Sequence, residues 1–277
     1  VGEQKIERLL KLSEKAKISV GIDSVDVAQP ISDSAKKRGL KIPVIIKVDT
    51  GLHRIGVPYG EPAVELAKKI DKMAGLEFAG IYTHEGHSYG LTEPNQVKSL
   101  ALEAGQLMIQ TAEMMKKSGI EVKTISVGST PTVRTSCTIK GITEVRPGTY
   151  IFSDYFEMRL GVATENDCAL TILATVISVP ADERAVIDAG TKSFTSDKAQ
   201  AFGVYGLIKG MPDVNLVRAY EEHGVLNTPK NKFKVGDRVE VIPNHVCPAV
   251  NLFDELVALR NDKVEAIWKV SARGKLK

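Results

Sequence analysis

A histidine and a cysteine stand two residues apart in the stretch PNHVCPAVNLFDE, residues 243–255. The imidazole of His245 and the thiolate of Cys247 are both good zinc ligands. The stretch follows the apolar run RVEVIP, which predicts a strand. Residues i and i+2 of a strand face the same side, so both side chains are expected to point at one ion. Two protein ligands suit an open catalytic position rather than a closed structural site. A buried cysteine beside an unrelated histidine is the alternative.

A second stretch has the composition of an anion-binding loop. VGSTPT follows another apolar run and offers Gly128, Ser129 and Thr130. Glycine lets the backbone approach an anion closely, and hydroxyl and amide groups can then donate to it. The pattern is neither a Walker sequence nor a GxGxxG fingerprint. A simple turn is therefore the alternative.

Three more side chains with suitable chemistry follow predicted strands. Arg54, in VDTGLHRIGV, could hold a carboxylate or phenolate because a guanidinium stays charged when partly buried, or it could pair locally with Asp49. His84, in YTHEGHSYG, could stack on a flat cofactor or move a proton. Arg146, in EVRPGTYIF, could bind a ring nitrogen or a phosphate, or could pair with Glu144.

The elements that must position these residues follow a repeating pattern. Up to about residue 155, an apolar run, a polar or glycine-bearing turn and a helical segment recur five times. Near-continuous apolar runs are typical of parallel strands covered by helices. The candidate residues fall at the C-terminal ends of these runs, which is where α/β barrels carry their active sites. We therefore expect an α/β fold of the (β/α)8 type. The first units of the barrel are missing from the sequence, because three more would need roughly 90 residues.

The pattern of apolar runs and turn residues changes in the second half of the chain. The runs ALTILATVISVP, RAVIDAG, RVEVIP and VEAIWKVSA are separated by Gly, Pro, Asn and Asp, without clear helical partners. This pattern predicts a mainly β domain. We place the partial α/β barrel at residues 1–160 and the mainly β domain, which carries the His245–Cys247 pair, at residues 161–277.

Composition excludes several classes of function. The net charge of +3 is mild and the basic residues are dispersed, so no nucleic-acid partner is expected. No apolar run is long enough to cross a bilayer, so no membrane partner is expected. Three cysteines without disulfide-like spacing favour a reducing, cytoplasmic location.

Five stretches together resemble one family. VDTGLHRIGV, THEGHSYG, VGSTPT, EVRPGTYIFSD and PNHVCPAVNLFDE fall in the order and at about the spacing seen in D-threonine aldolases and D-serine dehydratases. These are pyridoxal-phosphate enzymes of the alanine-racemase fold type, and the resemblance covers nearly the whole chain. It implies an N-terminal α/β barrel that binds pyridoxal 5'-phosphate and a C-terminal β domain. It also implies a catalytic divalent metal, with zinc ahead of manganese and magnesium, a small D-amino-acid substrate and a homodimer.

The resemblance also implies roles for single residues. The positions matching cofactor-binding residues are Gly128, Ser129, Thr130, Arg146 and Tyr150. The positions that lie against the pyridoxal ring, which we take as catalytic, are Arg54 and His84. The metal pair is matched by His245 and Cys247.

The residue at position 247 bears on the reaction. The His-x-Cys form resembles the zinc site of D-serine dehydratases, whereas well-known aldolases carry His-x-Asp. The stretch RPGTYIFSD is more similar to the aldolases. We expect a metal-dependent lyase acting on D-3-hydroxy amino acids, with D-threonine aldolase-like retro-aldol cleavage ahead of β-elimination. An amino-acid racemase and a degenerate, non-catalytic chain are further alternatives.

One part of the family pattern is missing. The lysine that links the cofactor covalently lies in the family's first barrel strand, N-terminal to anything in this sequence. The chain starts inside an amphipathic helix, VGEQKIERLLKL, so we expect it to be N-terminally truncated. No lysine here stands in a matching motif. We therefore expect the chain to hold no covalently bound cofactor.

Overall fold

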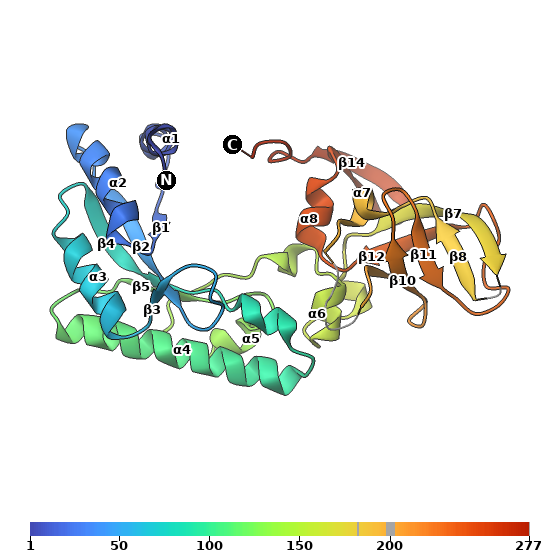
Figure 1. The fold of residues 1–277 in the computed structure, drawn as a ribbon, viewed down its shortest axis with the longest axis horizontal. Helices are drawn as coiled ribbons and strands as arrows, with labels where there is room; N and C mark the ends of the chain where they lie inside the picture. The colour runs from blue at the N-terminus through green and yellow to red at the C-terminus, as the bar shows by residue number, and fades with distance from the viewer. Residues whose placement is uncertain (182, 198–202, 277) are drawn as a thin grey trace. The chain divides into compact units, whose positions relative to one another are not determined.

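The computed structural model describes residues 1–181, 183–197 and 203–276 (Figure 1). The chain forms two compact units, each described here by itself. The α/β unit comprises Val1–Tyr89 and Asn95–Gly148, and the β unit comprises Gly90–Pro94 and Thr149–Lys277. The boundary predicted at residue 160 lies within the β unit.

Five parallel strands form the main path of the sheet in the α/β unit, in the order β1-β2-β4-β5-β6. Their bounds are β1 Val20–Ile22, β2 Ile42–Asp49, β4 Leu76–Tyr82, β5 Thr124–Val127 and β6 Glu144–Val145. A short strand, β3 (Val57–Pro58), pairs with β2. Spatial order follows sequence order, as in the wall of an α/β barrel. The predicted α/β fold with parallel strands is confirmed.

Helices alternate with these strands. Their bounds are α1 Glu3–Ser13, α2 Val25–Lys37, α3 Glu61–Asp71, α4 Pro94–Lys117 and α5 Val133–Ser136. The apolar face of α3 is buried: Ala63, Leu66, Ala67 and Ile70 are 0–7% exposed and belong to the core cluster of this unit. None of the described helices has both the length and the apolar character that crossing a bilayer requires.

Strand β2 has an apolar face that packs in the hydrophobic core and an opposite face that carries Lys47. Ile42, Val44, Ile46 and Val48 are at most 1% exposed and lie in the same hydrophobic cluster as the helices. Alternate residues of a strand point to opposite faces, so Lys47 points to the other face of the sheet. Truncating Ile46 to alanine should cost about 2–5 kcal/mol. The packed face therefore fixes the strand ends that carry the polar residues.

The β unit contains a closed antiparallel barrel with the strand order β10-β11-β8-β7-β12-β9. The bounds are β7 Ile172–Ala181, β8 Arg184–Ile187, β9 Gly206–Ile208, β10 Asn215–Ala219, β11 Gly224–Asn227 and β12 Arg238–Pro243. A separate two-stranded sheet pairs β13 Glu255–Arg260 with β14 Lys263–Lys269. Short helices of this unit are α6 Tyr155–Arg159, α7 Thr191–Phe194 and α8 Val246–Asn251, with 3-10 turns at Thr149–Ile151 and Glu165–Asp167; another 3-10 turn, Gly86–Gly90, begins in the α/β unit. The predicted mainly β domain is confirmed.

Every strand of the barrel contributes to its core. The buried residues, one from each strand and all at most 1% exposed, are Val176, Ile187, Ile208, Leu216, Leu226 and Val241. A barrel of so few strands has an interior that side chains fill. The barrel is therefore a packed scaffold, and polar side chains collect at its connecting segments.

Candidate active site

The loop after β5 carries Gly128, Ser129 and Thr130, the predicted phosphate-binding residues. Gly128 has a φ of 117°, and a Cβ there would lie 3.2 Å from a neighbouring backbone nitrogen, so the backbone path favours glycine. Ser129 and Thr130 are buried. The Ser129 amide donates to Thr132 Oγ1 at 3.0 Å, and the Gly148 amide donates to Thr130 Oγ1 at 3.1 Å. The loop is thus preformed and rich in small hydroxyl side chains.

His84 follows β4 and lies beside this loop. Its Nδ1 is 3.2 Å from the carbonyl oxygen of Gly128, which can only accept a hydrogen bond. The proton therefore sits on Nδ1, and Nε2 is left as the acceptor. Burial lowers the pKa of His84, the bond to Gly128 opposes this, and the positive charges of Arg54 and Lys47 lower it further. His84 is a neutral imidazole that can accept a proton at Nε2.

Arg146 follows β6 in the same unit. Its guanidinium carbon lies 5.1 Å from the centroid of the Tyr82 ring, and its Nη1 donates to Glu144 Oε1 at 3.0 Å. The pair with Glu144 that the sequence left as an alternative is therefore formed. Glu144 also accepts from Ser126 Oγ. These contacts hold Arg146 at the C-terminal end of the sheet.

Arg54 is exposed and forms no ion pair within the described ranges. The alternative pairing with Asp49 is wrong, because Asp49 binds His53 instead: Oδ2 lies 2.9 Å from His53 Nδ1, and Oδ1 accepts from the His53 amide. His53 has a φ of 55°, which turns the loop back toward Asp49 and leaves Arg54 beyond this contact. Arg54 is free to bind an anion.

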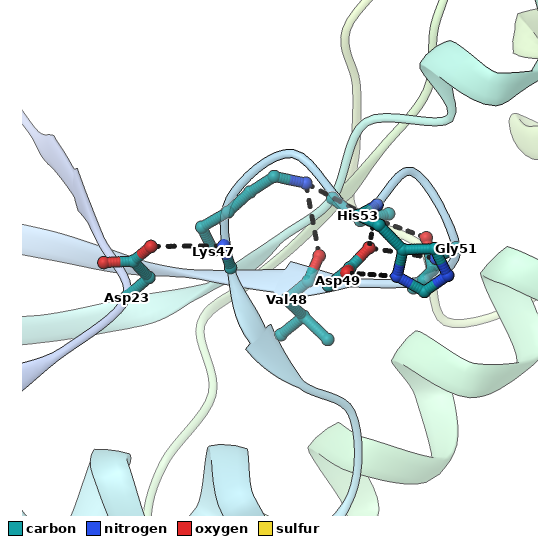
Figure 2. Close-up of polar contacts among 9 residues, drawn as sticks. Asp23, Lys47, Val48, Asp49, Gly51 and His53 are labelled. Carbon is teal, nitrogen blue, oxygen red and sulfur yellow. Dashed lines mark hydrogen bonds and ion pairs between the residues drawn. The ribbon is translucent and has the colours of Figure 1, made fainter.

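Lys47, on β2, was not identified from the sequence. Figure 2 shows its polar contacts. It is 3% exposed, and its Nζ donates to Val48 O at 3.2 Å and Thr83 Oγ1 at 3.4 Å. Nζ also lies 5.4 Å from the centroid of the Tyr82 ring. Burial lowers its pKa to about 8, although the negative charge of Asp49 opposes the shift. A lysine inside the apolar run VIIKV was the available signal.

Glu85 was also missed. It is fully buried, and neither carboxyl oxygen has a hydrogen-bond partner among the described residues. Burial raises the pKa of Glu85, against the opposing effects of nearby groups that include the Gly128 backbone and the Thr132 hydroxyl. Buried polar atoms usually have hydrogen-bond partners. The two carboxyl oxygens of Glu85 are an exception at this end of the sheet.

The predicted metal pair lies in the β unit, but not on a strand. Strand β12 ends at Pro243, His245 is the N-cap of α8, and Cys247 stands in the first turn of that helix. The strand-based reason for pairing them is wrong, because the chain turns into a helix between them. Burial lowers the pKa of His245, but hydrogen bonds to Cys247 and Asp197 outweigh burial and raise the pKa to about 9. Cys247 is exposed.

Within the part of the chain that the structure describes, no group of three or more His, Cys, Asp or Glu side chains has the arrangement of a metal site. His245 and Cys247 thus remain a pair, which fits an open position. Tyr150 lies in the 3-10 turn Thr149–Ile151 and is 63% exposed. It belongs to the β unit, whereas Arg146 belongs to the α/β unit, so its cofactor-binding role stays a prediction.

Comparisons with known proteins agree with both units. Residues 2–155 match the family model described as "Alanine racemase, N-terminal domain", and residues 169–259 match "Putative serine dehydratase domain". The chain is 34% identical over 268 residues to the D-threo-3-hydroxyaspartate dehydratase of Delftia sp. (strain HT23), covering 90% of this chain and 70% of that protein. It is 31% identical over 280 residues to the D-threonine aldolase of Arthrobacter sp., covering 99% and 72%. The chain belongs to the D-threonine aldolase and D-serine dehydratase family of alanine racemase-like pyridoxal-phosphate enzymes.

Solved structures of family members support this assignment. The D-threonine aldolase from Filomicrobium marinum has a TM-score of 0.89 and 28% identity, covering 100% of this chain and 76% of that one. Two structures of a D-threo-3-hydroxyaspartate dehydratase have a TM-score of 0.87, with 31% and 30% identity, and cover 97% of this chain and 76% and 74% of theirs. One is a cysteine-to-alanine mutant in a metal-free form, and the other is a histidine-to-alanine mutant. The mutated histidine stands two positions before the mutated cysteine.

Proposed function

We propose that this chain is the cofactor- and metal-binding part of a pyridoxal-phosphate-dependent lyase that acts on D-3-hydroxy amino acids. The observation that carries the proposal is the placement of His245 and Cys247 two positions apart at the start of α8. That is the spacing of the histidine and cysteine mutated in the related dehydratase, whose cysteine mutant was solved in a metal-free form.

The α/β unit has residues that fit pyridoxal phosphate. The buried hydroxyls of Ser129 and Thr130, on a loop that favours glycine at position 128, suit a phosphate group. When bound, the cofactor supplies an electron sink for charge that develops at the substrate α-carbon.

The other candidate residues bind and move protons. Arg54, exposed and without an ion pair in the described ranges, can hold a carboxylate or phenolate. Neutral His84 can accept a proton at Nε2. Arg146 lies beside the Tyr82 ring and can bind a ring nitrogen or phosphate. In the β unit, the cofactor-binding role of Tyr150 is proposed from the resemblance alone.

In the β unit, His245 and Cys247 would hold a divalent metal, with zinc preferred because its ligands are imidazole and thiolate. When bound, such a metal polarises a substrate hydroxyl, which either lowers the hydroxyl's pKa for carbon–carbon cleavage or makes hydroxide a better leaving group. Polarisation of the hydroxyl serves both reactions, so the presence of a metal does not by itself select between them.

We place β-elimination first. The thiolate in the pair is the feature shared with the D-threo-3-hydroxyaspartate dehydratase, which is also 34% identical to this chain. The stretch RPGTYIFSD favours retro-aldol cleavage. The similarity to the aldolase from Arthrobacter sp., which is 31% identical over 99% of this chain, supports this reaction as the second candidate.

One substrate separates the two reactions. The assay combines D-threo-3-hydroxyaspartate, pyridoxal phosphate and zinc with this chain joined to a relative's barrel segment that supplies the cofactor lysine. Elimination yields ammonia and oxaloacetate, whereas retro-aldol cleavage yields glycine and glyoxylate. We expect ammonia and oxaloacetate, lost on chelation. Glycine and glyoxylate would favour the aldolase. Turnover that survives chelation would contradict the metal-dependent lyase, and so would the absence of product from any D-3-hydroxy amino acid.

A further inference from the structure

Residues from two distant segments of the β unit converge on the metal pair. Neither was identified from the sequence. One segment is the start of α6, near residue 154, and the other follows α7 and carries Asp197. Both contact the short connection between β12 and α8 that carries His245 and Cys247.

Asp154 holds the backbone of this connection. Its side chain is 1% exposed, and each carboxyl oxygen accepts a backbone amide: Oδ1 from Glu157 at 3.2 Å and Oδ2 from Val246 at 3.0 Å. The first contact caps α6. The second fixes the amide that lies between the two metal-binding positions. One buried carboxyl thus joins the start of α6 to the connection between β12 and α8, so it can hold the connection rigidly.

Asp197 holds the imidazole. Its carboxylate is bonded to His245 Nδ1, and its own carbonyl oxygen accepts from the side-chain amide of Asn244 at 3.1 Å. Asn244 is 1% exposed and precedes His245 in the chain. The Phe156 ring lies edge-on to the imidazole, with centroids 6.0 Å apart and planes at 83°. With Nδ1 engaged by Asp197, Nε2 is the nitrogen left for a ligand bond.

We infer that Asp154 and Asp197 are positioning residues for the His245–Cys247 metal pair, Asp154 through the amide between the ligands and Asp197 through the imidazole ring. The inference rests on the proposed function in taking the pair as a metal site. A site with two protein ligands depends strongly on their mutual placement, because few donors share the binding. Loss of such supporting contacts typically lowers metal affinity about 10- to 100-fold.

The test measures zinc affinity by competition with a chromophoric chelator on the full chain. Asp197→Ala removes the contact to the ring. Asp154→Ser keeps a side chain that can cap α6 but is too short to reach both amides. We expect each change to lower zinc affinity about 10- to 100-fold. Asp197→Asn, which retains an acceptor for Nδ1, should recover part of the loss.

A matched control separates positioning from general weakening of the unit. Asp188 also accepts a backbone amide, from Thr175 at 2.7 Å, but in the barrel wall rather than beside the pair. Asp188→Asn should leave zinc affinity unchanged. With cobalt(II) as a spectroscopic probe, the thiolate-to-cobalt absorption should persist in Asp197→Ala, because Cys247 remains a ligand.

The outcomes distinguish this inference from the proposed function. Suppose His245→Ala and Cys247→Ala lose zinc while Asp154→Ser and Asp197→Ala bind it like the unaltered chain. The positioning role is then refuted and the metal site stands. If all four variants bind zinc like the unaltered chain, the metal site itself is elsewhere and the proposed function fails. An equal loss of affinity in Asp188→Asn would also overturn the positioning role.

Discussion

Lys47 should make the stability of the α/β unit depend on pH in a defined direction. Burial lowers its pKa from 10.5 to about 8. Below pH 8 the ammonium is charged in both the folded and the unfolded chain, and the folded state carries the full cost of burying it. Between pH 8 and 10.5 the unfolded chain holds the proton more tightly, so stability rises with pH. Above 10.5 the cost is gone.

The magnitude follows from the same pKa values. At about 1.36 kcal/mol for each pKa unit, the shift from 10.5 to about 8 corresponds to about 3 kcal/mol. Lys47→Met removes this cost but also removes two long hydrogen bonds and the contact with the Tyr82 ring. We therefore expect the free energy of unfolding to rise by about 1–3 kcal/mol at pH 7.

Urea unfolding of the two proteins, followed at steps between pH 6 and 10.5, measures the effect. The gap between Lys47→Met and the unaltered chain should be constant up to about pH 8 and should close as the pH approaches 10.5. Lys140→Met, at an exposed position of the same unit, is the control and should show no such gap. Parallel pH profiles for Lys47→Met and the unaltered chain would refute the reasoning.

Three other predictions concern the loop, the thiols and the barrel. Gly128→Ala places a Cβ at a φ of 117° and should lower the free energy of unfolding by about 1–3 kcal/mol. It should also weaken pyridoxal-phosphate binding, measured by absorbance titration. Unchanged affinity would count against the role of this loop in phosphate binding. Burial raises the pKa of Cys168 to about 12, so Cys137 and Cys247 should react with a thiol reagent at pH 7 while Cys168 reacts only after unfolding. Zinc should protect Cys247 alone. Leu216→Ala, which empties a fully buried position in the barrel, should lower the free energy of unfolding by about 2–5 kcal/mol in urea titrations, and a smaller loss would show that the barrel core relaxes.

Local patterns were sufficient for the architecture. The apolar runs of the α/β unit became strands because burial on both faces requires continuous apolar sequence. The buried residues of α3 recur at helical spacing in the sequence, so their common face can be found from the pattern alone. In the second half, short apolar runs bounded by turn residues became the strands of the barrel.

The candidate site was harder to predict because its contacts join distant residues. Asp197 and His245 are 48 positions apart, and no local pattern marks their contact. Asp154 did carry a signal, because an acidic residue three positions before Glu157 has the form of a helix start. Its second contact, to Val246 across 92 positions, carried none. His245 and Cys247 were named correctly as neighbours, but the proline-bounded stretch was read as strand instead of helix.

The supports of the metal pair act on the His245 ring and the Val246 amide, and leave the Cys247 side chain exposed. Under the proposed function, the donor atom at position 247 can therefore change while the contacts of Asp154 and Asp197 stay in place. A thiolate there favours soft metals such as zinc, whereas a carboxylate favours manganese and magnesium. The proposed site would thus change its metal preference by substitution of this one residue.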